Sequence, residues 1–452
     1  MEFLEKIQQA GVVGAGGAGF PTHVKLKAKA RWLILNAAEC EPLIETDKFL
    51  CRNFADRIVA AAVVTAAHLG AEHTVIAIKG KYEAEIRALQ AAIDAAGQPI
   101  EICKMSTFYP AGDEQTMVQW VTGRSVPERG LPLDVEAVVD NVGTMLTIYD
   151  AITEGSGASM KYLSVVGEVP HPVMVHAPIG TPITQCIAAA KPLLEKYAVI
   201  VGGPMMGKVL ADPQQIEQAV VTKTTGNLLV LPREHYLITR AGRPMERLAL
   251  QAKTACIQCR MCTDLCPRFQ IGHDVQPHLV MRNLYREQLT DDATEWVRAF
   301  GSAANCCSCG ICEMFACPMG LSPRKVNEYI KGRMRERGIQ VPRNQQPEAR
   351  DSLNLRRVPT ERLIARLDLS RYDGLHASDD CLEIHPDRLF VPFSQHIGKP
   401  AQPVCKVGDT VQKGQLVAAA AADGLSANIH CGVHGVVTEL TDGGIWIAAK
   451  EG

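Results

Sequence analysis

Nine of the sixteen cysteines fall between Cys256 and Cys317, and their spacing specifies a chemistry more narrowly than any other part of the sequence. The stretch CIQCRMCTDLCP places Cys256, Cys259, Cys262 and Cys266 in the pattern C-x2-C-x2-C-x3-C-P. This pattern is typical of a [4Fe-4S] site, because three thiolates on one tight loop can each reach a different iron of the cube. A zinc site typically uses two separated C-x2-C pairs, so the third closely spaced cysteine argues against zinc.

A second run, CCSCGICEMFACP, repeats this spacing, although four residues instead of three precede its last cysteine. Two such runs indicate two clusters, in which the last cysteine of each run binds the other cluster. The predicted ligands are Cys256, Cys259, Cys262 and Cys317 for cluster 1, and Cys306, Cys309, Cys312 and Cys266 for cluster 2. Cys307 is left over and is expected to be a thiol that binds no metal. An inert structural role for both clusters is the alternative to electron transfer.

Bulk properties limit the environment and the partners of the chain. It has 452 residues and a formal net charge of -2, so no global field favours nucleic acid or an anionic membrane. The N-terminus lacks the features of a secretory signal, and no window approaches the roughly 18 apolar residues of a membrane span. We expect a cytoplasmic protein with several domains, no membrane span and no nucleic-acid partner. The cysteines outside the two runs are expected to be buried thiols rather than disulfides.

A second candidate site lies near the N-terminus, in GVVGAGGAGFPTHVKLK. Gly14, Gly16 and Gly19 fit G-x-G-x-x-G, which marks a dinucleotide site only when a strand precedes the loop and a helix follows it. Here Phe3 and Ile7 lie at helical spacing before the loop, and the strand-like RWLILNAAECEP comes after it. This order is wrong for a Rossmann turn. A flexible glycine loop without a ligand is the plain alternative.

Four stretches of the first 155 residues, taken in order, carry a resemblance to known proteins. They are GAGGAGFPTHVKLK (14–27), NAAECEP (36–42), YPAGDEQ (109–115) and DNVGTM (140–145). Together they resemble the flavin-binding subunit of respiratory NADH dehydrogenase and, more closely, the C subunit of Rnf-type electron transport complexes. The later GGPMMG is typical of the Rnf-like branch. The resemblance implies that the glycine loop holds FMN rather than a Rossmann dinucleotide.

The resemblance also implies roles for individual residues. Glycines without a Cβ let backbone N–H groups approach an anion closely, and Lys25 matches the family lysine that contacts the flavin phosphate. The implied FMN residues are Gly14, Gly16, Gly17, Gly19, Lys25, Asn36, Glu39, Gly112, Asp113, Asn141 and Thr144. The implied NADH residues are Phe20, Glu41 and Glu114, and for the two glutamates an exposed structural carboxylate is the alternative.

Two positions depart from the respiratory pattern. Ala38 stands where that flavin-binding protein has an acid, which removes a polar contact and weakens the NADH assignment. Asp140 stands where the same pattern has asparagine, which is a milder change.

The motifs and the patterns between them predict a multidomain α/β and α+β protein. The expected parts are an α/β FMN- and NADH-binding domain (1–155), a soluble-ligand-binding β-grasp domain (156–225), a helical two-cluster ferredoxin-type domain (245–340), a linker (341–384) and an all-β barrel-sandwich hybrid domain (385–452). The last part lacks the hairpin lysine that a lipoyl carrier would present, so we expect a docking module rather than a swinging arm.

In Rnf C subunits the barrel-sandwich domain lies at the N-terminus, whereas here it follows the clusters. This order resembles the cobalamin reductases of propanediol-utilisation microcompartments. The resemblance implies an NADH-dependent reductase that takes cob(III)alamin through cob(II)alamin to cob(I)alamin, with a corrinoid adenosyltransferase and a microcompartment shell protein as partners. A flavin would link the hydride donor NADH to the one-electron clusters.

The corrinoid-binding motif D-x-H-x-x-G is absent, so cobalamin would bind transiently or on a partner. Two alternatives involve no corrinoid chemistry. One is an Rnf-like electron-transfer subunit, and the other is an electron-wiring or scaffold protein docked to a microcompartment shell.

Overall fold

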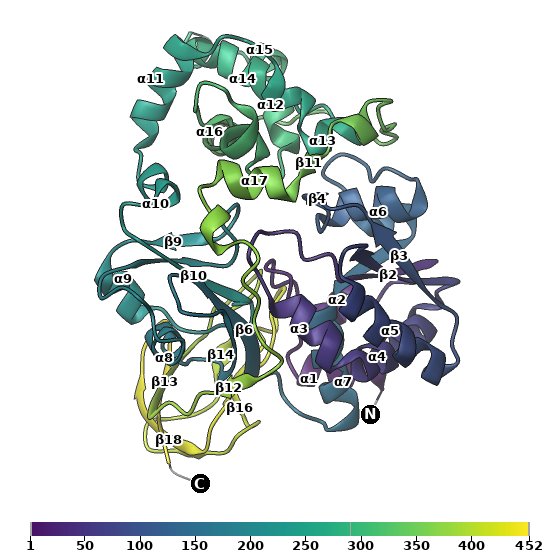
Figure 1. Cartoon of the computed structure of the whole chain (residues 1–452), viewed down its shortest axis with the longest axis vertical. Coiled ribbons are helices and arrows are strands. Elements are labelled where there is room, and N and C mark those ends of the chain that lie inside the picture. The colour runs from purple at the N-terminus through teal and green to yellow at the C-terminus, as the bar shows by residue number, and fades with distance from the viewer. Residues whose placement is uncertain (1, 290, 451–452) are drawn as a thin grey trace.

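The computed structural model describes residues 2–289 and 291–450, so the outermost residues of the two expected terminal domains lie outside it. Figure 1 shows an N-terminal α/β domain on the right, a mixed sheet at the left, helices at the top and a β domain at the lower left. None of the helices in the described part of the chain combines the length and the hydrophobicity that a membrane span requires.

The N-terminal domain is built on a parallel sheet with the strand order β3-β2-β1-β5. Successive residues of β1 face opposite sides: Leu33 and Leu35 pack with the cluster of α4 and α7, and Ile34 packs with that of α6. The elements are α1 (Phe3–Gln9), α2 (Thr22–Lys25), β1 (Trp32–Asn36), α3 (Thr46–Asn53), α4 (Ala55–Leu69), β2 (His73–Lys79), α5 (Glu83–Ala96), β3 (Ile100–Met105), β4 (Phe108–Tyr109), α6 (Glu114–Thr122), β5 (Ala137–Asn141) and α7 (Val142–Thr153). The glycine loop lies between α1 and α2, ahead of β1, so the order of elements is not that of a Rossmann turn.

The second part is a mixed six-stranded sheet with the order β12-β7-β6-β10-β8-β9. Its elements are β6 (Met160–Gly167), β7 (Val173–Pro178), α8 (Ile183–Ala189), β8 (Ala198–Val201), β9 (Lys208–Leu210), α9 (Pro213–Gln218) and β10 (Asn227–Leu231). We expected this domain to end at residue 225, but β10 lies beyond that boundary and in the middle of the sheet, fully buried between β6 and β8.

The third part is helical and carries both cysteine runs. It contains α10 (Tyr236–Ala241), α11 (Met245–Ala255), α12 (Met261–Asp264), α13 (Pro267–Gln270), α14 (Pro277–Asn283), α15 (Ala293–Phe300) and α16 (Pro323–Glu336). Its core surrounds the buried side chains of Trp296 and Phe300.

The segment 341–384, expected to be an irregular linker, has ordered elements that tie the other parts together. It contains β11 (Val358–Pro359), α17 (Thr360–Arg366) and β12 (Cys381–Glu383). β11 pairs with β4 of the N-terminal domain, and β12 extends the mixed sheet beside β7. The expectation of a plain linker was therefore wrong, because these short strands are recognisable only by the partners they pair with.

The C-terminal part consists of two sheets, ordered β13-β19-β18-β15 and β14-β16-β17. Its strands are β13 (Arg388–Pro392), β14 (Gln402–Pro403), β15 (Thr410–Val411), β16 (Leu416–Ala419), β17 (Ile429–His430), β18 (Gly435–Leu440) and β19 (Gly444–Ala449). It packs against the first two parts: Nζ of the buried Lys223 donates to the carbonyls of Gly11 and Asn428, each at 2.6 Å.

Candidate flavin and cluster sites

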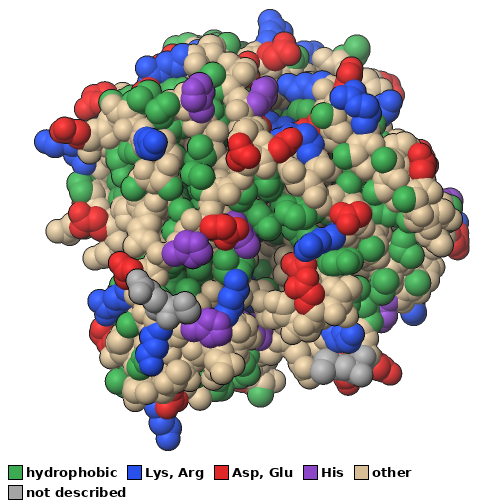
Figure 2. Space-filling view, turned by 60° about the horizontal axis from the view of Figure 1, so that its bottom comes forward, with side chains coloured by type: hydrophobic (Ala, Val, Ile, Leu, Met, Phe, Trp, Pro, Cys, Tyr) green, Lys and Arg blue, Asp and Glu red, His purple; other side chains and the backbone are tan. Residues whose placement is uncertain are grey.

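A cavity of about 1710 Å³ opens where the glycine loop meets the carboxyl ends of β1 and β5. Ligands of α/β proteins commonly bind at this edge of a sheet. The cavity lining includes thirteen of the fourteen residues predicted to contact FMN or NADH, all except Gly19. Figure 2, which brings the lower end of the molecule forward, shows that this face is hollowed near its centre, with apolar surface recessed among histidine and charged side chains.

Gly19 is the predicted FMN residue that the structure places elsewhere. Its carbonyl accepts a hydrogen bond from the N–H of Ile397 at 3.1 Å. A Cβ at this position would lie 2.9 Å from Thr224 and 3.2 Å from His396, and its φ is +65°. The glycine is therefore explained by close contact with the mixed sheet and the C-terminal domain, and not by an approach to a ligand.

The rest of the loop presents free backbone to the cavity. The N–H of Gly16 donates to no other described residue, and Gly17 has a φ of +105° with open space where a Cβ would lie. The loop is held in place by the N–H of Ala15, which donates to Oγ1 of Thr144 at 3.0 Å. Such a cradle of unobstructed N–H groups fits the phosphate of FMN.

Lys25 borders the cavity but already has partners. Its Nζ donates to the carbonyl of Val139 at 2.7 Å and lies 3.2 Å from Oδ1 of Asp140. Asp140 is buried, and burial raises the pKa of its carboxyl although Lys25 opposes this shift. The departure at Asp140 thus places a carboxylate beside the lysine expected to contact the phosphate.

Polar groups also line the cavity near Asn36 and Asn141. The Nδ2 atom of Asn36 donates to the carbonyl of Gly112 at 3.0 Å, and the Nδ2 atom of Asn141 donates to Oδ2 of Asp47 at 2.7 Å. Burial raises the pKa of Glu39, and the neighbouring Asp47 raises it further. Burial also raises the pKa of Asp47 to about 6.

The two glutamates expected near NADH are half-buried rather than exposed. Burial raises the pKa of Glu41 to about 7, although its Oε2 accepts a hydrogen bond from the N–H of Met205 at 2.9 Å. A Cβ on Gly203 would lie 2.2 Å from this carboxylate, which explains a glycine in GGPMMG. Burial also raises the pKa of Glu114, against the charge of Lys25. Ala38, in contrast, is fully buried in the core and does not line the cavity.

One wall of the cavity is shared with the second cysteine run. Cys307 and Cys309 line the cavity, and the hydroxyl of Tyr109 donates to the carbonyl of Cys309 at 2.7 Å. Beside them, Nη2 of Arg268 lies 2.8 Å from Oδ2 of Asp113, and both side chains are largely buried. Sequence analysis did not single out Tyr109 or Arg268, although Tyr109 lies within YPAGDEQ and Arg268 directly follows the first Cys-Pro pair.

The cysteines predicted to bind cluster 1 lie around a small cavity of their own. Its lining includes Cys256, Cys259, Cys262 and Cys317. Hydrogen bonds to sulfur come from Nε2 of Gln258, 3.1 Å from Sγ of Cys256, and from the N–H of Leu321, 3.3 Å from Sγ of Cys317. Four thiols converging from two runs, with donors to the sulfurs, fit a [4Fe-4S] cluster.

Cys266 lies near the second run instead of the first. Burial raises the pKa of its thiol, and the nearby Cys307 and Cys306 add to the shift. The pKa of Cys312 is likewise raised by burial and by its neighbours Cys306, Glu313, Cys262 and Cys266. The structure thus places Cys266 with the run that ends in Cys317, as an exchange of last ligands between two clusters requires.

Three family models match separate parts of the chain. The Nuo51 FMN-binding domain matches residues 7–150, a 4Fe-4S dicluster domain matches residues 255–322, and the RnfC barrel sandwich hybrid domain matches residues 382–449. These matches confirm the predicted multidomain α/β architecture with its flavin, cluster and C-terminal parts. An FMN-binding domain and a dicluster domain in one chain define an oxidoreductase that transfers electrons between flavin and iron–sulfur centres.

Similarity to individual proteins narrows this class further. Proteins named cobalamin reductase PduS from Citrobacter freundii and Salmonella typhimurium are each 37% identical to the chain, over 98% and 99% of its length and 95% and 96% of theirs. The C subunit of the ion-translocating oxidoreductase complex of Pseudomonas aeruginosa is 34% identical over 59% of the chain and 33% of that protein. The chain belongs to the family of cobalamin reductase PduS, and the resemblance drawn from the motifs is confirmed.

Proposed function

We propose that this protein is an NADH-dependent cobalamin reductase that uses FMN and two [4Fe-4S] clusters. The observation that carries the proposal is the shared wall: residues of the second cysteine run line the same cavity as the predicted flavin residues. A bound flavin supplies exchange between a two-electron hydride donor and one-electron carriers. The contact between Tyr109 and Cys309 joins the flavin cavity to the second cysteine run, which supports electron transfer between the flavin and the clusters.

The binding part of the proposal rests on this chain's own residues. We infer that the glycine loop and Lys25 hold the FMN phosphate, while Asn36, Glu39 and Asn141 border the rest of the flavin. A cavity of about 1710 Å³ exceeds the roughly 300–1,000 Å³ of a site for one ligand of ordinary size. That volume supports NADH binding beside the flavin, with Phe20, Glu41 and Glu114 lining its place.

The acceptor is inferred from the relatives named cobalamin reductase. Reduction of cob(III)alamin through cob(II)alamin to cob(I)alamin needs one electron at a time, which suits iron–sulfur donors. A corrinoid adenosyltransferase would consume the cob(I)alamin. The same relationship supports a place in or at a bacterial microcompartment, with a shell protein as a further partner.

An anaerobic absorbance titration with NADH, followed by aquacobalamin, tests the proposal. We expect NADH to bleach the flavin and aquacobalamin then to be reduced. In a Cys259→Ala variant that retains its flavin, bleaching should persist, because it needs only the N-terminal cavity, while cobalamin reduction should fall sharply. An equal amount of free FMN serves as the control, since reduced flavin alone can reduce corrinoids. Normal cobalamin reduction by the variant would place the clusters off the path and contradict the proposal.

A further inference from the structure

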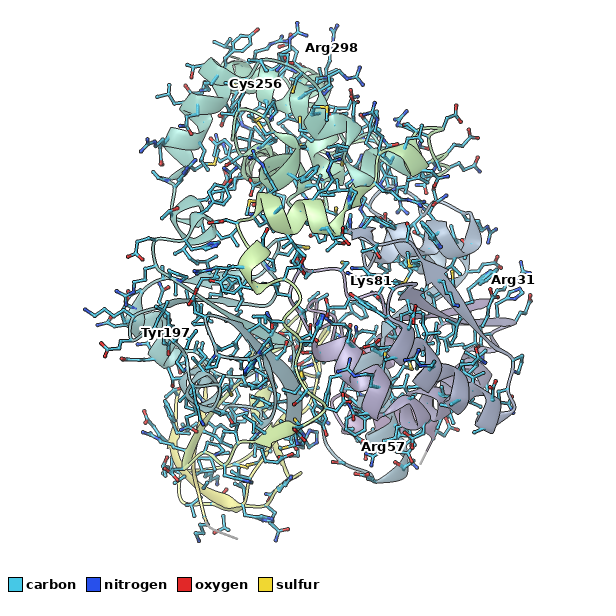
Figure 3. The ribbon with its side chains drawn as sticks, in the orientation of Figure 1. Arg31, Arg57, Lys81, Tyr197, Cys256 and Arg298 are labelled. Carbon is cyan, nitrogen blue, oxygen red and sulfur yellow. The ribbon has the colours of Figure 1, made fainter. Side chains whose placement is uncertain are left out.

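The two predicted cluster sites lie at different depths in the molecule. The site of cluster 2 borders the flavin cavity, because Cys307 and Cys309 belong to its wall. The site of cluster 1 does not share that lining, and its Cys259 is exposed. In Figure 3, Cys256 lies at the upper end of the molecule, far from Arg57 in the N-terminal domain. Cluster 2 is therefore the inner site, and cluster 1 is the outer site.

The surface over the outer site is apolar. Ile257 and Met319 line the cavity of cluster 1 and are nevertheless 61% and 48% exposed. Leu250, on the adjoining helix α11, is 63% exposed. Scattered apolar side chains are ordinary, but a group of them around one functional centre marks an interaction site. We call Ile257, Cys259, Arg260 and Met319, which all line this cavity, the outer-cluster surface.

The charges around this surface are mainly positive. Four basic residues are exposed on α11, on the cluster loop (the first cysteine run, 256–266) and on α14: Arg247, Lys253, Arg260 and Arg282. The exposed acid among these elements is Glu246, while Asp264 is half-buried and lies 3.5 Å from Arg260. Since the whole chain has a formal net charge of -2, this local excess of positive charge is a feature of the surface and not of the protein at large.

We propose that the outer-cluster surface docks an acidic protein that accepts single electrons. An apolar centre supplies contact area and a basic surround steers an acidic partner, which is how transient redox complexes achieve fast association. One electron leaves this protein and reduces the carrier of the partner by one electron, and no atom or proton has to move with it. The inference rests on the proposed function for its supply of electrons and adds the place where they leave.

The test uses flavodoxin, an acidic protein with a one-electron carrier, as the probe. The variant Ile257→Glu/Met319→Glu places two carboxylates on the outer-cluster surface, and Leu193→Glu/Leu355→Glu makes the same kind of change at two exposed positions elsewhere. Calorimetry on the oxidised holoproteins measures binding without turnover, and stopped-flow mixing measures reduction of flavodoxin by dithionite-reduced protein. We expect the first variant to lose at least tenfold in both measurements. The second should stay within twofold, and added salt should weaken binding of the unmodified protein.

Iron content and the cluster EPR signals show whether the first variant keeps both clusters. Lys253→Glu, which lies outside the cluster loop, is the second variant and should also weaken flavodoxin binding. No binding of flavodoxin to the unmodified protein, or equal binding by all variants, would overturn the proposal. If the first variant lost aquacobalamin reduction as strongly as flavodoxin reduction, the surface would belong to the corrinoid itself, and the proposal of a protein partner would be overturned. Because dithionite bypasses NADH, a failure of NADH to reduce the flavin would count against the proposed function only.

Discussion

Replacement of Asp140 tests directly how the glycine loop holds a phosphate. Oδ1 of Asp140 lies 3.2 Å from Nζ of Lys25, and Oδ2 has no hydrogen-bond partner among the described residues. In Asp140→Asn, Lys25 would keep the carbonyl of Val139 as a partner but would lose the carboxylate that offsets its charge. We therefore expect the variant to bind FMN more tightly than the unmodified protein.

The size of the effect follows from the geometry at Lys25. A phosphate oxygen about 2.8 Å from Nζ would lie no more than about 6 Å from Oδ1 of Asp140, because the second distance is 3.2 Å. Two unit charges about 6 Å apart repel by about 3 kcal/mol at an effective dielectric constant of about 20. Since about 1.4 kcal/mol corresponds to a factor of ten, the Kd for FMN should fall by roughly 10- to 100-fold, the smaller value applying if water screens the phosphate.

Fluorescence titration of the flavin-free protein measures this change. Riboflavin, which lacks the phosphate, should show no such difference between Asp140→Asn and the unmodified protein. Lys25→Ala should weaken FMN binding by about 1.5–3 kcal/mol. Because the two side chains are in contact, the change in FMN affinity caused by Asp140→Asn should differ between the Lys25→Ala background and the unmodified protein. An Asp140→Asn variant that folds normally but binds FMN no better, or that gains equally with riboflavin, would refute the reasoning.

Three further changes have defined outcomes. Burial lowers the pKa of Lys223 to about 7. Between about pH 7 and 10 the unfolded chain therefore binds a proton at Lys223 that the folded chain lacks. The contribution of Lys223 to the free energy of unfolding should rise over this range by up to about 1.4 kcal/mol per pH unit. Lys223→Met should flatten that part of the pH profile in chemical denaturation. Arg268→Met should cost about 3–5 kcal/mol in urea unfolding, because it leaves Asp113 buried without its charge partner, and Arg268→Lys should cost less. Cys307→Ala should leave about eight irons per chain, as two cubanes require, and a loss of about four would make Cys307 a ligand.

The features predicted best from the sequence are those encoded by short stretches. The spacing of Cys256, Cys259 and Cys262 specifies a cluster loop locally, and the match to a dicluster domain confirms that class of site. The order of the elements around the glycine loop argues against a Rossmann turn, and the resemblance of four short motifs to flavin-binding subunits implies FMN; the match to an FMN-binding domain confirms that class. The end of the second domain at residue 225 was predicted wrongly, because only the pairing of β10 with β6 and β8 reveals that this strand belongs to the mixed sheet.

The contacts between parts of the chain could not be predicted, because they join residues far apart in the sequence. Tyr109 and Cys309 are 200 positions apart, and Asp113 and Arg268 are 155 positions apart. Each partner alone fits an ordinary local role: Asp113 caps α6 by accepting from the N–H of Thr116, which already explains an aspartate there. A pattern that has one sufficient local explanation gives no sign of a second, tertiary one.

The same argument applies to Glu41 and Gly203, and it bears on function. From the sequence, Glu41 was a candidate NADH residue and GGPMMG only a marker of the Rnf-like branch. In the structure, Glu41 accepts from the N–H of Met205, and a side chain at position 203 would collide with the carboxylate. The glutamate therefore fixes the mixed sheet against the N-terminal domain at the edge of the flavin cavity. A carboxylate with this structural task, and with a pKa raised to about 7 by burial, sets the shape and the charge of the cavity whether or not it also touches the nucleotide.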